Sequence, residues 1–155
     1  MAESEKERTD RQLSELLNEL RVALPGAQVL LAFLLTAPFA TRFDRASRLD
    51  HAVLFACTVV TGAGVLLLLA PSVYHRMRWT EGGKEDVIRV GHVLFLIGTA
   101  CLAVGLCLGI FVVGDFLYGA LAAGLATSLL AVIVAVTWYL LPLERGHDPG
   151  VRRLP

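Results

Sequence analysis

The stretch VGHVLFLIGTACLAVGLCLGIFVV, residues 90–113, contains no charged side chain. At roughly 1.5 Å per residue, a helix of this length can cross a hydrocarbon core of about 30 Å. Three further runs share this property, at residues 23–40, 51–70 and 116–141. Together the four runs predict an all-α membrane protein with four transmembrane helices in a bundle. The expected spans cover about residues 25–40, 51–70, 88–113 and 116–141.

The overall composition agrees with a membrane location. Hydrophobic residues make up 55% of the 155 residues and the mean hydropathy is +0.64, which is above the usual range of soluble domains. The length allows one domain. The formal net charge is zero and no phosphate-binding or RNA-binding motif is present, so we expect no nucleic-acid partner.

The segments before, between and after the spans suggest the remaining organisation. Residues 1–8 are predicted to be disordered, and residues 142–155 to form a tail. Residues 9–24 are predicted to form an amphipathic helix that lies in the membrane interface or packs on a partner helix. Its apolar stripe at helical spacing consists of Leu13, Leu16, Leu17, Leu20 and Leu24. Pro25 is predicted to bend the chain, and Pro71 to follow the end of the second span. Gly114-Asp115 is predicted to form the turn between the third and fourth spans.

The distribution of basic residues predicts the orientation in the membrane. Four spans place both termini on one side. Eleven of the fourteen Lys and Arg residues then lie with the termini and the second loop. The first loop carries the other three, Arg42, Arg45 and Arg48. The positive-inside rule therefore predicts that both termini are cytoplasmic.

Small residues in the last two spans predict close helix packing, because lipid provides little hydrophobic drive between helices. Span three carries Gly91, Gly98, Gly105 and Gly109, and span four carries Ala120, Gly124 and Ser128 at four-residue spacing. We expect the glycine face of span three to pack on the small face of span four. The alternative is that the glycine face forms a homodimer.

One polar cluster is expected at the cytoplasmic face. It could bind an anionic lipid headgroup or a protein partner, with arginine as the donor and glutamate orienting it. Ordinary salt bridging that fixes the first helix to the bundle explains the same residues. The members of the cluster are Glu15, Asn18, Glu19, Arg21, Gln28, Tyr74, His75 and Arg76.

The residues that usually carry chemistry do not form a recognisable site. Cys57, Cys101 and Cys107 lie in apolar runs without a paired motif, and they are expected to be small buried residues. The four histidines form no local pattern for a metal, and Ser72, Ser128 and the threonines of the spans have no adjacent histidine or acid. We therefore expect no cofactor, no metal and no enzymatic activity.

Two stretches resemble a known family. They are ELLNELRVALPGAQVL at 15–30, continuing into AFLLTAPF at 32–39 and Arg42-Phe43, and APSVYHRMRW at 70–79. They resemble a family of small bacterial membrane proteins, common in actinobacteria, whose function is unknown. The resemblance covers nearly the whole chain. It implies a four-span protein of the bacterial plasma membrane and implies no activity or catalytic residue.

Together these observations favour a structural or interaction protein of the plasma membrane. Its expected partners are membrane lipid and, in addition, a protein or a second copy of the chain. Two alternatives stay open. One is a small oligomeric transporter or channel component, which the absence of charged residues from the interiors of the four apolar runs disfavours. The other is an accessory subunit of a larger membrane enzyme.

Overall fold

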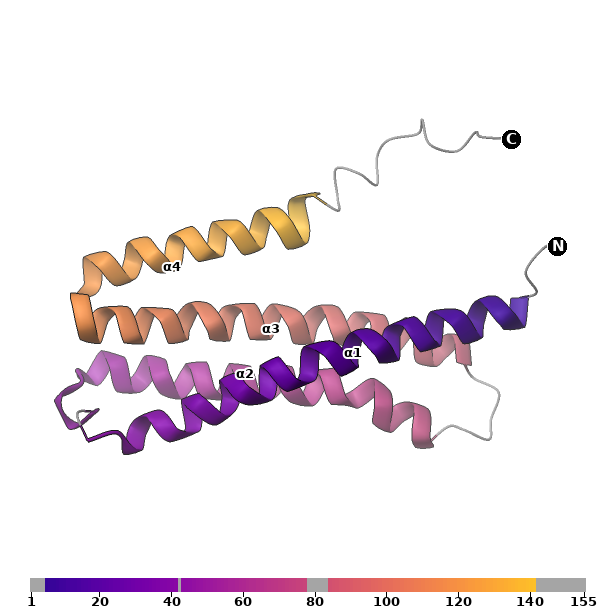
Figure 1. Ribbon diagram of the computed structural model, residues 1–155, viewed down its shortest axis with the longest axis horizontal. Helices are drawn as coiled ribbons and strands as arrows, with labels where there is room; N and C mark the ends of the chain where they lie inside the picture. The colour runs from indigo at the N-terminus through magenta and orange to yellow at the C-terminus, as the bar shows by residue number, and fades with distance from the viewer. Residues whose placement is uncertain (1–4, 42, 78–83, 142–155) are drawn as a thin grey trace.

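The computed structural model describes residues 5–41, 43–77 and 84–141, and these residues contain helices and short connections with no strand. Four long helices follow one another in alternating directions (Figure 1). They are α1 (Glu5–Thr36), α2 (Arg48–Met77), α3 (Lys84–Tyr118) and α4 (Ala120–Val134), with 3-10 turns η1 (Ala37–Phe39) and η2 (Phe43–Arg45) and a π-helical segment η3 (Ala135–Leu140). By length and composition, all four are suited to cross a membrane. The predicted all-α fold with four membrane-length helices is confirmed.

The unequal lengths of the helices indicate which part of the molecule lies in lipid. α4 and η3 together span 21 residues, or about 32 Å, which matches a hydrocarbon core of about 30 Å. α3 has 35 residues, or about 52 Å. The α1–α2 and α3–α4 connections lie at one end of the molecule, here called the turn end (Figure 1). The surplus length of α1, α2 and α3 reaches past the end of α4 at the opposite end, here called the open end (Figure 1).

Glycines build the centre of the α2–α3 contact, which is the most extensive contact between helices. A Cβ atom placed on Gly64 would lie 3.0 Å from the carbonyl oxygen of Gly98 and 3.1 Å from the Cβ of Cys101. A Cβ atom on Gly98 would lie 3.0 Å from Leu68. The two backbones approach this closely because neither glycine has a side chain.

The rest of the α3 glycine face also meets α2 and α1. Gly91 adjoins Pro71 and Leu16, Gly105 adjoins Thr61, and Gly109 adjoins Cys57 and Leu34. The Cys57 thiol donates a hydrogen bond of 2.9 Å to the carbonyl oxygen of Gly105. The prediction that this face packs on span four is wrong, because α2 and α1 already cover it. The homodimer stays a prediction.

The expected small face of α4 has a different environment. Ala120 and Ser128 are exposed, and a Cβ atom on Gly124 would have nothing within 4 Å. α4 instead meets α3 through Ala123, whose Cα would lie 3.0 Å from a Cβ atom on Gly114. Four-residue spacing identifies a small face, but several such faces exist and the spacing does not choose among them.

The α3–α4 turn lies later in the chain than predicted. Gly114 and Asp115 belong to α3, and the turn is made by Gly119, which has a φ of +87°. Only glycine adopts this left-handed conformation without a steric penalty. The Gly119 N–H donates to the carbonyl oxygen of Asp115 at 3.0 Å and so completes the last turn of α3.

Neither internal proline ends a helix. α1 continues through Pro25 and α2 continues through Pro71, so the helix assignment is unbroken at both prolines. Proline removes one backbone donor, and a helix tolerates this where neighbouring groups or water bind the freed carbonyl. Pro25 is exposed, whereas Pro71 is buried and fits against Gly91, which has no side chain to exclude it.

The start of α1 also differs from the prediction. Glu5–Arg8 are helical, although residues 1–8 were expected to be disordered, and residues 1–4 lie outside the described part of the chain. Glu, Lys and Arg are good helix formers, so the helix extends towards the N-terminus. The predicted tail at 142–155 also lies outside the described residues.

The apolar stripe of residues 9–24 packs within the molecule. Leu16 and Leu20 form a buried cluster with Leu68 of α2, and Phe95 and Leu102 of α3 pack against it. Leu13 is buried too. The sequence allowed this segment either to lie in the membrane interface or to pack on another helix. In the structure it packs on α2 and α3 of the same chain.

A reciprocal cap starts α2 at the turn end. The Asp50 N–H donates to Ser47 Oγ at 3.0 Å, and the Ser47 N–H and hydroxyl donate to Asp50 Oδ2 at 2.9 Å and 2.8 Å. Beside it, His51 Nδ1 donates to the Ser47 carbonyl oxygen at 2.8 Å, and its ring lies 4.6 Å from that of Phe43. The Ser47-x-x-Asp50 pattern has the form of a capping box, and it holds η2 against α2.

Ser47→Ala is expected to lower the free energy of unfolding by about 1 kcal/mol, because the Asp50 N–H loses its side-chain acceptor. Reversible unfolding of the detergent-solubilised protein would measure this. Thr36→Ala serves as the control, since the Thr36 hydroxyl bonds only carbonyl groups of its own helix. Equal stability of Ser47→Ala and wild type would show that the cap contributes nothing.

Candidate functional site

A polar hollow lies between α1 and α3 towards the open end. Its volume is about 220 Å³. α1 contributes residues spaced three and four apart, which places them on one helix face, and α3 contributes two residues four apart. The lining residues are Gln12, Glu15, Leu16, Glu19, Ile88 and His92. Because Leu16 is buried against α2 and α3, its polar neighbours on α1 are held at the α3 side.

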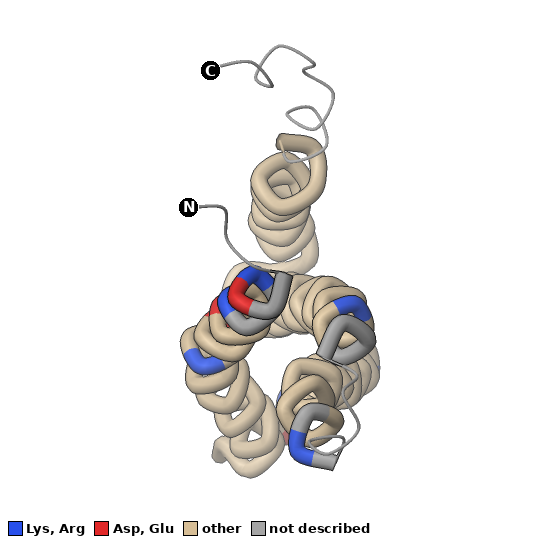
Figure 2. The backbone as a smooth tube through the Cα atoms, turned by 90° about the vertical axis from the view of Figure 1, so that its right-hand side faces the viewer, with Lys and Arg blue, Asp and Glu red and all other residues tan. Residues whose placement is uncertain are grey.

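The electrostatics of this polar hollow are set by two carboxylates. Glu15 and Glu19 both line it, one helical turn apart. An exposed ion pair of 3.4 Å joins Glu15 to Arg11, and exposed pairs of this kind stabilise little. Figure 2, viewed from the open end, shows acidic and basic residues together on the first turns of α1. The lining of the polar hollow thus carries two carboxylates, one of them paired with Arg11, together with the Gln12 amide and the His92 ring.

The structure brings together only part of the predicted cluster. Glu15 and Glu19 line the polar hollow together with His92 of α3, which is not a member of that cluster. Gln12 and Ile88 were not predicted as members of the site. Gln12 could have been, because its spacing from Glu15 and Glu19 places all three on one face of the helix. The other α1 members of the predicted cluster, Asn18, Arg21 and Gln28, are exposed and do not line it.

The second part of the cluster belongs to a helix and not to a loop. Tyr74, His75 and Arg76 lie in α2, since that helix extends to Met77. Tyr74 is half-buried and Arg76 is exposed, and neither lines the polar hollow. The His75 side chain lies outside the described part of the structure. An anion site built from arginine and glutamate stays a prediction, and of the described members of the cluster only Glu15 and Glu19 line the polar hollow.

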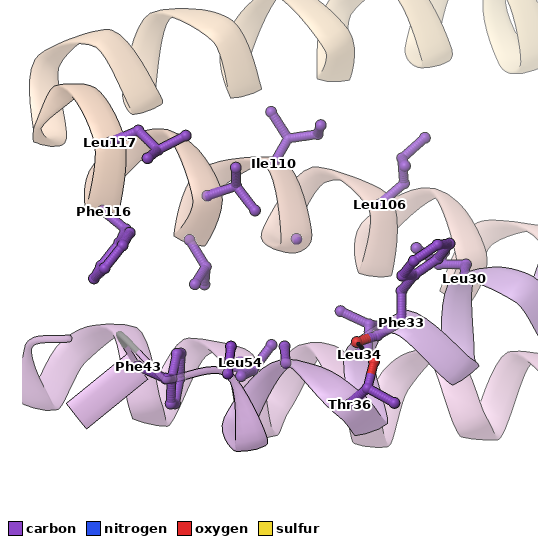
Figure 3. Close-up of a pocket in the computed structure, with 15 residues that line it drawn as sticks. Leu30, Phe33, Leu34, Thr36, Phe43, Leu54, Leu106, Ile110, Phe116 and Leu117 are labelled. Atoms are coloured by element: carbon purple, nitrogen blue, oxygen red, sulfur yellow. Dashed lines mark hydrogen bonds between the residues drawn. The ribbon is translucent and has the colours of Figure 1, made fainter. Parts of the chain in front are cut away.

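A larger hollow, here called the apolar groove, lies near the turn end and was not predicted. Its volume is about 580 Å³. The end of α1, the η1 and η2 turns, Leu54 of α2 and the last turns of α3 enclose it (Figure 3). Its lining residues are Leu30, Phe33, Leu34, Thr36, Ala37, Ala40, Phe43, Leu54, Leu106, Gly109, Ile110, Val112, Val113, Phe116 and Leu117.

The apolar groove offers almost no hydrogen-bonding group. The one side-chain hydroxyl in its lining, that of Thr36, donates within α1 to the carbonyl oxygens of Ala32 at 3.1 Å and Phe33 at 3.0 Å. No sequence signal marks this site, because its residues belong to uniformly apolar runs. Only the packing of α1 against α3 leaves space among them.

The described residues show no arrangement for metal chemistry. Among residues 5–41, 43–77 and 84–141, no three His, Cys, Asp or Glu side chains come together to hold an ion. The three cysteines are free thiols, with Cys57 buried and the other two half-buried. Nothing in this part of the chain assigns a catalytic group.

The fold and the two hollows define an all-α protein with four membrane-length helices, of the multi-pass membrane class. A family model described as Family of unknown function (DUF6328) matches residues 2–142. The chain therefore belongs to this family. No curated protein and no solved structure matches it.

Proposed function

We propose that this protein is a non-catalytic interaction protein of the plasma membrane, and that its polar hollow receives a basic group. The donor is a lysine or arginine of a protein partner or the ammonium of a lipid headgroup, which share the same chemistry. The observation that carries the proposal is the pair of carboxylates, Glu15 and Glu19, at the wall of one hollow. A cation placed there gains charge-assisted hydrogen bonds.

The depth of the polar hollow supports this proposal. A core of about 30 Å corresponds to roughly 20 helical residues. Counted back from Thr36, that length reaches Leu17, and counted back from Tyr118 it reaches Thr99. Glu15 and His92 thus lie beyond the counted lipid core, and Glu19 lies two residues inside its edge, less than one helical turn from the charged groups of lipids and of other proteins.

We further propose that the open end faces the cytoplasm, on the basis of the excess of Lys and Arg in the segments assigned to that side. Reporter fusions after Leu141 and before Glu5 are expected to be active as cytoplasmic fusions only. Activity of either fusion on the other side of the membrane would contradict this orientation.

Removing both carboxylates is expected to release the basic partner. Glu15→Gln with Glu19→Gln keeps size and hydrogen bonding but removes two charges, and we expect recovery of the bound partner or aminolipid to fall by about tenfold. Quantitative mass spectrometry after purification in mild detergent would measure it, with phosphatidylethanolamine followed as the lipid candidate.

The matched control for this experiment is Asn18→Ala, because Asn18 is exposed on the same helix but does not line the polar hollow. It is expected to leave recovery unchanged. If the double glutamine variant retained the same proteins and lipids as wild type, the polar hollow would be ordinary solvated surface, and this function would be rejected.

A further inference from the structure

The apolar groove has the volume and the lining of a ligand site. Its volume of about 580 Å³ falls within the range of roughly 300–1,000 Å³ typical of small-molecule sites. Hydrophobic side chains dominate its wall, and its hydroxyl is internally bonded. Water in such a space would find no partner, so an apolar occupant is favoured.

The position of the apolar groove indicates what occupies it. Its lining residues in α1 and α3 belong to membrane-length apolar segments, so the groove lies at the depth of lipid chains. Val113 and Leu117 line it and are 56% and 58% exposed, which leaves a lateral opening towards lipid. In Figure 3, Leu106, Ile110 and Leu117 rise from α3 on one side and Phe33 lies across from them on α1. An acyl chain can enter from the bilayer without crossing water.

The charges beside the apolar groove indicate which lipid is favoured. Phe43 lines the groove, and η2 carries the chain from Phe43 directly to Arg45. Arg45 and Arg48 are exposed, whereas Asp50 is 3% exposed and its Oδ2 accepts from Ser47. Asp44, directly before Arg45, is the exposed acid of residues 43–50, so among the exposed charges of this stretch two guanidinium groups face one carboxylate.

We propose that the apolar groove binds one acyl chain of an anionic phospholipid, whose phosphate is held by Arg45 and Arg48 at the turn end. Arginine suits this role because its planar donors match phosphate oxygens in pairs. This site is at the opposite end from the polar hollow and does not depend on the function proposed for it.

Filling the apolar groove tests the proposal. Val113→Trp places a large ring at its opening, and Val132→Trp on α4, where the valine is similarly exposed at 59% but outside the groove, is the matched control. Delipidated full-length protein in mild detergent would be titrated with phosphatidylglycerol carrying palmitoyl and oleoyl chains and followed by native mass spectrometry. We expect Val113→Trp to weaken binding by about tenfold and Val132→Trp to leave it unchanged.

A second variant and a second lipid complete the experiment. Leu117→Trp is expected to repeat the loss, which covers the case in which Val113→Trp does not fold. Phosphatidylcholine is expected to bind less tightly than phosphatidylglycerol, and Arg45→Ala with Arg48→Ala is expected to abolish that preference. Binding of phosphatidylglycerol that survives both groove-filling variants would overturn the proposal, as would a wild-type dimer that these variants dissociate without altering lipid binding.

Discussion

Gly64→Val is expected to lower the free energy of unfolding by about 2–3 kcal/mol, which is at the upper end of overpacking costs. The new Cβ would approach the Gly98 carbonyl oxygen to 3.0 Å and the Cys101 Cβ to 3.1 Å. A backbone oxygen cannot rotate away, so α2 and α3 must separate. Reversible unfolding of the purified protein by SDS in mixed micelles would measure the change.

The control for this prediction is Gly124→Val. Gly124 lies in α4 with nothing within 4 Å of a built Cβ, so we expect a change within about 0.5 kcal/mol. Equal effects of the two substitutions would contradict the α2–α3 contact described here. A larger effect at Gly124 than at Gly64 would restore the packing predicted from the sequence, in which the small face of span four is the buried one.

Leu20→Ala is expected to destabilise the protein by about 2–4 kcal/mol. Leu20 is 2% exposed and packs with Leu16 of the same helix and with Leu68 of α2, so truncation leaves a cavity that the surrounding helices fill only in part. In lipid this cost comes mainly from lost packing contacts, because transfer of leucine between protein and lipid has little driving force. The same unfolding measurement applies.

The control is Val22→Ala, since Val22 is 75% exposed on the same helix. It is expected to change stability by no more than about 0.5 kcal/mol. This pair also tests where the first half of α1 lies. If residues 9–24 lay flat in the membrane interface, away from α2 and α3, Leu20→Ala and Val22→Ala would have similarly small effects.

The sequence predicted the membrane-length helices well because the signal is local. An uncharged run such as residues 90–113 must satisfy its backbone groups internally in lipid, and a helix does this without any neighbour. The ends of the helices were predicted less well. Gly114-Asp115 and Gly119 both carry turn signals, and only a left-handed φ at Gly119 identifies the turn.

The candidate sites show a similar division. Glu15 and Glu19 were singled out because charged residues next to an apolar run are visible in the sequence, and both line the polar hollow. Arg76 and Gln28 were grouped with them by charge and expected depth, yet they do not reach it. Depth along a helix follows from residue number, whereas the direction in which a side chain points depends on how that helix is rotated in the bundle.

By itself, the sequence determined that this chain is helical, that it has four segments of membrane length, and that its third span has a glycine face. Each of these properties depends on a residue and its near neighbours along the chain. The tertiary structure decided that the glycine face meets α2, that α1 packs as one helix through Pro25, and that an apolar groove lies at the turn end. Lipid solvates every apolar face almost equally well, so steric fit selects which faces meet, and fit depends on residues far apart in sequence.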